Sequence, residues 1–363
     1  MKPKTGYLVL QNGKVFRGER FGADGDTIAE IVFQTGMIGY IETLTDKSYY
    51  GQAVVQTFPQ IGNYGVISAD FDGDMIGPRA YIVKNWCQTP SNFRSEGDID
   101  AFLSSRGVVG LSGIDTRTLI KILRTEGSLN GAIVDDPDGV DFEALRGYKT
   151  EGAAEAVSVE EVKRFGIDGA SKTVALLDFG YSTGIVSAFN KRGCNVIVCP
   201  AMTTFQDISK MGVDGIILST GPGNPAESEE IISNIKEITG MGIPVFGVGL
   251  GHQLAAIACG MKTVRLPYGH HGGQPVRYIN PNDSNNGRVY TACHNHGYAV
   301  AGDSIDKSVA DEIFVSAVDG TNEGLEYKNK KMITVQFNPC GGAEDTQWVV
   351  DRFIDMMDGG LNI

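Results

Sequence analysis

Short apolar runs alternate with turn residues over the first part of the chain. Between residues 6 and about 85, stretches such as TGYLVLQNGKVFRG and GQAVVQTFPQIGNYGVISADFDGD predict β-strands joined by tight turns. A helix is expected in SGIDTRTLIKILRTEGSLNGAIV, because Asp115 or Thr116 can cap it and Gly127 can end it. The apolar residues that share one face of this helix are Leu119, Ile122 and Leu123. We therefore expect residues 1–145 to form a β-rich, mixed α/β domain.

The pattern changes after a stretch of small and acidic residues. GYKTEGAAEAVSVEEVKRFGIDGASK has few large apolar side chains, and we place a connection between domains at residues 146–172. Beyond it, the apolar runs TVALLDFG, NVIVCP, DGIILST and IPVFGV alternate with the helical stretches IVSAFNKRG, FQDISKMG and EIISNIKEITGMG. Strands that are apolar throughout and separated by crossover helices are typical of a parallel sheet covered on both faces. Residues 173–363 are therefore expected to form a doubly wound α/β domain.

Composition is consistent with a globular protein of this kind. The 363 residues exceed one ordinary core, and 42% hydrophobic with 21% charged residues excludes a disordered chain. Lys and Arg total 31 against 44 Asp and Glu, a net charge of −13 that disfavours nucleic acid and anionic membranes as partners. The start, MKPKTGYLVLQNGKVF, resembles neither a secretory signal nor an anchor, so we expect a cytoplasmic protein. The six cysteines lack CxxC spacing and are expected to be reduced thiols.

The most informative motif is IPVFGVGLGHQLAAIACG, a strand that enters a glycine-rich turn and leaves as a helix. In hydrolases this nucleophile elbow exposes a reactive side chain, while the next backbone N–H, here that of Leu250, helps to hold an oxyanion. Gly249 occupies the position of the reactive residue and has no side chain. A phosphate-binding loop or a plain strand-to-helix turn would have a similar sequence. The motif alone therefore leaves these alternatives open.

Three other stretches follow predicted strands, where ligands of α/β sheets collect. In ILSTGPGNPAE, Gly221 and Gly223 can present backbone N–H groups. The histidine-rich stretches GHHGGQPV and TACHNHGYAV are glycine-rich, with no carboxylate or thiol at fitting spacing, so we expect loops and no metal site. MITVQFNPCGGAEDTQWVVDRFIDMM predicts a strand ending at Phe337, a polar turn and a closing helix. That turn is where a triad would have its general base and orienting acid.

In this order, the motifs resemble those of triad-type glutamine amidotransferases. FQTGMIGYIETLTDKSYYGQ, PQIGNYGV, GIDTRTLIKILRTEGSLNGAI, GHHGG and HNHGYAV further resemble the carbamoyl phosphate synthetase small subunit, over all of the chain except about 137–172. In that family a Cys-His-Glu triad hydrolyses glutamine and ammonia passes to a large subunit. The large subunit uses ATP and bicarbonate to make carbamoyl phosphate, a precursor of arginine and pyrimidines. The resemblance implies a large-subunit partner and no cofactor in this chain.

At the triad positions this chain departs from the family. PVFGVGLGHQ, Pro244 to Gln253, stands for PVFGICLGHQ and puts Gly249 at the nucleophile. VQFNPCG stands for VQFHPEA and puts Asn338 at the base and Cys340 at the acid. Glycine has no atom to attack an amide, an asparagine amide accepts no proton near neutral pH, and Cys340 supplies no carboxylate. We therefore predict that glutamine hydrolysis is lost.

The resemblance also implies a partly altered glutamine pocket. The family pattern DFGxKxN is DFGYSTG here, so Ser182 replaces the lysine and Gly184 the asparagine. Gly36 matches a position that is often Ser, and Tyr298 replaces a common Phe. The remaining positions that match the family's glutamine-binding surface are Gly221, Gly223, Leu250, Gln253, Asn295 and Gly297. Weak binding of glutamine or another small ligand is therefore conceivable.

Three functions remain open from sequence. The first is a non-hydrolysing small subunit that docks to a large subunit and supports ammonia-dependent synthesis. The second is a glutaminase that uses an unrecognised nucleophile, such as Cys340 or Cys293. The third is a regulatory protein that binds another small ligand in the former pocket.

Overall fold

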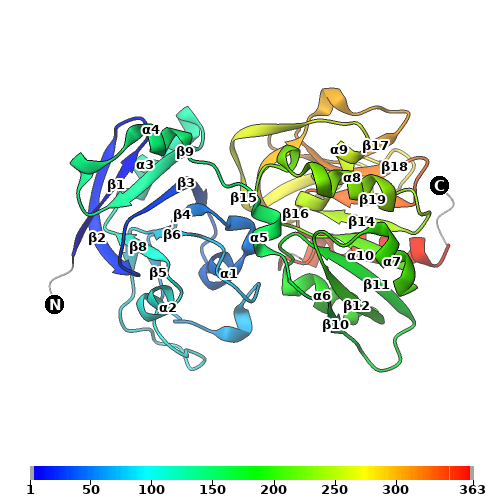
Figure 1. Cartoon of the computed structure of the whole chain (residues 1–363), viewed down its shortest axis with the longest axis horizontal. Coiled ribbons are helices and arrows are strands. Elements are labelled where there is room, and N and C mark those ends of the chain that lie inside the picture. The colour runs from blue at the N-terminus through cyan, green and yellow to red at the C-terminus, as the bar shows by residue number, and fades with distance from the viewer. Residues whose placement is uncertain (1–3, 343, 360–363) are drawn as a thin grey trace. The chain divides into compact units, whose positions relative to one another are not determined.

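Strands dominate the first part of the structure, as the alternation of apolar and turn residues predicts. The computed structural model describes residues 4–342 and 344–359 of the chain (Figure 1), which divides into a unit of residues 1–151 and a unit of residues 152–363. The predicted connection, 146–172, lies across this division. Its later part contains helix α5, Ala153–Val157, and strand β10, Lys163–Phe165, which joins the sheet of the second unit.

The first unit is built on a closed barrel in which antiparallel and parallel pairs of strands are mixed. In barrel order the strands are β1 Thr5–Leu10, β2 Val15–Gly22, β8 Val109–Ser112, β6 Ala80–Ile82, β4 Gln52–Gln56, β3 Thr27–Gln34 and β9 Leu129–Val134. Short strands β5, Gln60–Ile61, and β7, Asn85–Trp86, pair in parallel beside it. The helices of this unit are α1 Tyr40–Thr45, α2 Ile99–Ser105, α3 Thr116–Glu126 and α4 Phe142–Gly147.

Helix α3 confirms the prediction made for this segment. The Asp115 carboxylate accepts a hydrogen bond of 3.0 Å from the Thr118 N–H and so caps the first turn. Gly127 ends the helix with a φ of 88°, which favours glycine. Leu119 and Leu123 pack in the same buried cluster as residues of the barrel strands. The apolar face of α3 therefore covers the barrel core.

A mixed sheet forms the second unit, and its order is β10-β12-β11-β13-β14-β19-β18-β17-β15-β16. Its parallel centre confirms the doubly wound prediction and consists of β12 Cys194–Pro200, β11 Lys172–Asp178, β13 Gly215–Leu218, β14 Val245–Val248 and β19 Met332–Val335. Beyond β19 the sheet continues with the antiparallel strands β18 Asn322–Tyr327, β17 Ala310–Ser316, β15 Thr263–Tyr278 and β16 Val289–Val300. The expectation of loops at both histidine-rich stretches is wrong, because they lie in β15 and β16.

Helices cover both faces of the parallel centre. Apolar residues of α7, Phe205–Met211, α8, Glu229–Ile238, and α9, Leu250–Ala258, belong to one buried cluster. Those of α6, Thr183–Asn190, and α10, Trp348–Met357, belong to the cluster on the opposite face. This arrangement leaves the carboxyl ends of the parallel strands as the edge where loops meet.

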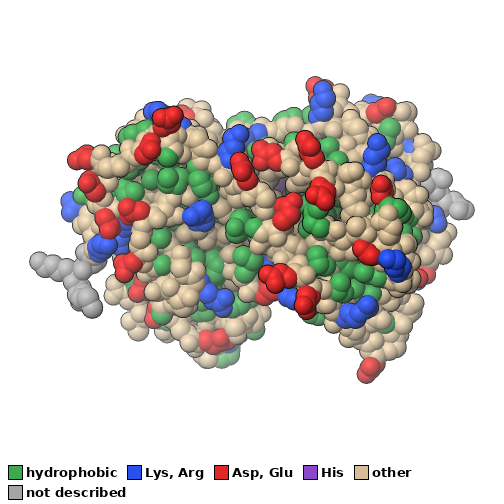
Figure 2. Space-filling model, in the orientation of Figure 1, with side chains coloured by type: hydrophobic (Ala, Val, Ile, Leu, Met, Phe, Trp, Pro, Cys, Tyr) green, Lys and Arg blue, Asp and Glu red, His purple; other side chains and the backbone are tan. Residues whose placement is uncertain are grey.

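Charged side chains are spread over the described surface. On the face shown in Figure 2, acidic and basic side chains are interspersed and no basic stripe of the kind that binds nucleic acid is present among the described residues. Within residues 4–342 and 344–359, no helix has the length and apolar character needed to cross a membrane. The described cysteines are free thiols, as predicted.

Candidate functional site

The turn between β14 and α9 has the strained geometry of a nucleophile elbow. Gly249 has φ 57° and ψ −111°, a combination that residues with a side chain rarely adopt. Its N–H donates a 2.9 Å hydrogen bond to the carbonyl of Val335 at the end of β19. A methyl group at position 249 would lie 3.1 Å from Thr220 Cγ2. Glycine relieves the strain that a nucleophile at this position would impose.

The elbow is held against β13 by close backbone contact. The Gly251 N–H donates to the Ser219 carbonyl at 2.9 Å, and a side chain on Gly251 would collide with the Leu218 carbonyl at 2.2 Å. Leu250 is the first residue of α9, so its N–H has no acceptor within the helix. The turn therefore has the backbone geometry of a nucleophile elbow, with no side chain at position 249.

Gly221 and Gly223 lie in the loop after β13, next to the loop after β11. A side chain on Gly221 would approach the Phe179 carbonyl to 2.1 Å, so only glycine fits there. Gly223 has a φ of 95°, which also favours glycine. In the loop after β11, the buried Asp178 carboxylate accepts N–H hydrogen bonds of 2.8 Å from Gly180 and Tyr181. These contacts fix two loops beside the elbow.

The turn after β19 brings several departures from the family pattern together. Asn338 Oδ1 accepts a 2.9 Å hydrogen bond from the Cys340 N–H, and the Asn338 N–H donates to the Cys293 carbonyl at 2.9 Å. A side chain on Gly184 would approach the Cys340 carbonyl to 2.7 Å. Ser182 caps α6 by accepting a 3.2 Å hydrogen bond from the Gly184 N–H. Asn338 therefore stabilises a turn, and Ser182 caps the first turn of α6.

The other predicted glutamine-binding residues of this unit form hydrogen bonds or border open space. Gln253 Nε2 donates to the Tyr298 carbonyl at 2.7 Å and to Gln336 Oε1 at 2.9 Å, which ties α9 to β16 and the end of β19. Asn295 Oδ1 hydrogen-bonds His271 Nδ1 at 2.9 Å. A side chain on Gly297 would meet no atom within 4 Å. Gln253 and Asn295 thus have structural partners of their own.

Gly36 lies in the first unit, between β3 and α1. Its N–H donates to Gln34 Oε1 at 3.0 Å, and its carbonyl accepts from Gln56 Nε2 at 2.6 Å. Side-chain amides on both sides therefore hold its backbone.

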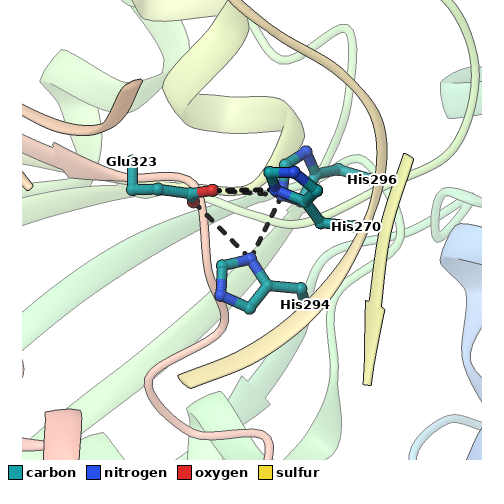
Figure 3. Close-up of side chains that lie close together, drawn as sticks. All are labelled: His270, His294, His296 and Glu323. Carbon is teal, nitrogen blue, oxygen red and sulfur yellow. Dashed lines mark hydrogen bonds and ion pairs between the residues drawn. The ribbon is translucent and has the colours of Figure 1, made fainter. Parts of the chain in front are cut away.

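Sequence reasoning missed Glu323, a fully buried carboxylate of β18. Figure 3 shows it with His270 of β15 and with His294 and His296 of β16. The argument that no carboxylate lies at fitting spacing is wrong, because β18 supplies one from a distant part of the sequence. The largely polar sequence NEGLEY gives no signal that Glu323 is buried or which residues surround it.

Comparisons with known proteins cover both units. Residues 8–133 match the family described as carbamoyl-phosphate synthase small chain, CPSase domain, and residues 175–356 match glutamine amidotransferase class-I. The carbamoyl phosphate synthase small chain of Clostridium perfringens is 40% identical over 96% of this chain and 98% of its own. The pyrimidine-specific small chain of Bacillus subtilis is 40% identical over 97% and 95%. The chain belongs to the carbamoyl phosphate synthase small chain family.

A solved glutamine amidotransferase from Thermotoga maritima also matches. Its similarity covers 53% of this chain and 86% of its own, with a TM-score of 0.39 and 17% identity. The small-chain relatives match nearly the whole of this chain, which confirms the family expected from the sequence motifs.

Replacing Gly249 with Ala is expected to destabilise this small chain by about 1–3 kcal/mol, because the backbone at 249 is strained for any residue with a Cβ. The measurement is the free energy of unfolding in urea. Gly302→Ala is the matched control, since a methyl there meets no atom within 4 Å and the backbone is ordinary; we expect a change within about 0.5 kcal/mol. Equal effects of the two substitutions would contradict the strain at Gly249.

The burial of His252 predicts that the free energy of unfolding depends on pH. It is fully buried in α9, its Nδ1 lies 2.8 Å from Thr334 Oγ1, and burial lowers its pKa to about 3. Below about pH 6.5, the unfolded chain binds a proton at His252 that the folded chain does not bind. The contribution of His252 to the free energy of unfolding is therefore complete above that pH and is lost as the pH falls towards 3.

His252→Gln should therefore flatten the decline in unfolding free energy between pH 6 and 4 by about 1.4 kcal/mol per pH unit. Urea denaturation of the native chain and the variant at a series of pH values measures this difference. Parallel curves would show that His252 is protonated equally in the folded and unfolded states.

Proposed function

We propose that this chain is a carbamoyl phosphate synthase small subunit that does not hydrolyse glutamine and that supports ammonia-dependent synthesis by a large subunit in the cytoplasm. The observation that carries the proposal is the elbow at Gly249, whose backbone geometry is retained without a nucleophilic side chain. Acyl transfer from glutamine through a covalent intermediate requires an atom that attacks the amide carbon. Position 249 offers none.

The residues at the two other triad positions support the same conclusion. The Asn338 side chain accepts a hydrogen bond from the Cys340 N–H, so it serves the turn. An amide does not take a proton from a nucleophile near neutral pH. Cys340 has no carboxylate with which to orient an imidazole. A nucleophile restored at 249 would therefore still lack its base.

Glutamine hydrolysis by another thiol is disfavoured, because the histidines that could act as its base are oriented elsewhere. Cys293 precedes His294 in β16, and successive side chains of a strand point to opposite faces. The adjacent histidines, His294 and His296, have their cluster-facing nitrogens within 3.7 Å of Glu323. His252 is bonded to Thr334 and is buried. Three other thiols, Cys194, Cys199 and Cys259, have a raised pKa because of burial.

Docking to a large subunit is supported by the first unit. Residues 8–133 match the domain that defines the small chain, and the barrel with its α3 cover has a complete buried core. The losses described above concern the second unit alone. Assembly can therefore be retained in a chain that has lost one reaction.

Co-expression with a carbamoyl phosphate synthase large subunit should yield a complex that makes carbamoyl phosphate from ammonium, ATP and bicarbonate. With glutamine as the only nitrogen source, we expect no rate above the background without a nitrogen donor. The assay measures carbamoyl phosphate for both donors on the same complex. Glutamine-driven synthesis comparable to the ammonium rate would overturn the proposal, as would failure to co-purify.

Restoring the nucleophile alone should not restore the reaction. Gly249→Cys is expected to release glutamate from glutamine no faster than buffer, because Asn338 supplies no base. The triple variant with Asn338→His and Cys340→Glu is the matched comparison and should exceed the single variant. Efficient hydrolysis by Gly249→Cys would reveal a base among other residues.

A further inference from the structure

Four side chains that can bind a metal converge inside the antiparallel part of the second unit's sheet. His270 comes from β15, His294 and His296 from β16, and Glu323 from β18, and one ligand atom of each lies within 4.8 Å of the other three. None of these residues is more than 8% exposed. Figure 3 shows the three imidazoles and the carboxylate pointing toward one centre.

Four separations between ligand atoms of this cluster are close to the edge length of a small coordination tetrahedron. His270 Nδ1 lies 3.0 Å from Glu323 Oε1, and His294 Nδ1 lies 3.5 Å from Glu323 Oε2. His296 Nε2 lies 3.2 Å from His294 Nδ1 and 3.7 Å from Glu323 Oε1. Zinc bound at about 2.0–2.1 Å in a tetrahedron has ligand atoms about 3.4 Å apart. The four separations lie on both sides of that value.

Hydrogen bonds outside the cluster orient two of the imidazoles for metal binding. His270 Nε2 lies 2.9 Å from Asp319 Oδ2, and His296 Nδ1 lies 2.9 Å from the Tyr298 carbonyl. Both partners are acceptors, so these nitrogens carry protons, and in neutral imidazoles the opposite nitrogens would direct lone pairs into the cluster. Such second partners are typical of histidines that bind zinc.

Without a cation, the cluster contains buried groups that are poorly satisfied. Glu323 Oε2 has no hydrogen-bond partner among the described residues, although the residue is fully buried. The side chains of His270, His294 and His296 that surround this carboxylate are buried as well. A divalent cation would balance the carboxylates of Glu323 and Asp319 and accept the converging lone pairs.

We propose that His270, His294, His296 and Glu323 bind one divalent first-row transition-metal ion, most favourably Zn²⁺, in a closed site that joins β15, β16 and β18. Imidazole ligands with one carboxylate suit zinc, whereas Mg²⁺ and Ca²⁺ prefer oxygen ligands. Four buried protein ligands leave no position for substrate, so the ion stabilises the fold. This inference is independent of the proposed function, because it involves none of the triad positions.

The test uses the untagged full-length chain. After removal of metal with a chelator and titration with Zn²⁺ alone, elemental analysis of the desalted protein should give about one zinc per chain. Replacing Zn²⁺ with Co²⁺ should give the intense visible absorption of tetrahedral cobalt without a thiolate charge-transfer band. The thermal unfolding midpoint should rise on adding Zn²⁺ to the metal-free chain.

His294→Gln and Glu323→Gln should each weaken Zn²⁺ binding by at least about 100-fold, because each removes a ligand. His252→Gln is the matched control, a buried histidine outside the cluster, and should still bind one equivalent. If a cluster variant fails to fold, the Co²⁺ spectrum of the native chain still decides the question. Absence of tetrahedral absorption, a thiolate band, or unchanged zinc content in both cluster variants would overturn the proposal; the first result would assign the cluster to a proton-sharing network.

Discussion

Backbone contact at the carboxyl edge of the parallel strands is the constraint on which the second unit depends. The Gly249 N–H bonds the Val335 carbonyl, and the Gly251 N–H bonds the Ser219 carbonyl, so β14 and α9 are fastened to both neighbouring strands. Buried N–H and carbonyl groups must be paired, and these bonds form only if the backbones approach closely. Glycine at 251 permits that approach, because a side chain would overlap the Leu218 carbonyl.

The same constraint means that the fold of the elbow does not depend on the side chain at its tip. The elbow is formed by main-chain bonds, so its geometry does not require a side chain at 249. The side-chain oxygens of Asn338 and Ser182 accept hydrogen bonds from backbone N–H groups of their own turns. Both residues therefore have structural partners in this chain, and the turn after β19 is bonded to β16 through the Cys293 carbonyl.

In the antiparallel half of the sheet, successive side chains of β16 alternate between the two faces, so His294 and His296 lie on the same face. Strand pairing places His270 opposite His296 and β18 beside β17. Glu323 belongs to β18 and lies 27 residues after His296 in the sequence. The cluster is buried while its partners Asp319 and Tyr298 lie at its rim. A metal ion there would link β15 and β16, at the antiparallel edge of the sheet, to β18, which pairs with β19 of the parallel centre.

The sequence by itself determined the elements that local chemistry controls. The cap at Asp115, the stop at Gly127, the parallel core strands and the glycine in the elbow follow from residue type and spacing, and the family follows from motifs in order. Only the tertiary structure decided that the histidine-rich stretches are strands, that Asn338 caps a turn and that Glu323 meets three histidines. Those outcomes depend on strand pairing between distant segments, and the spacing of residues along the chain does not specify which strands become neighbours.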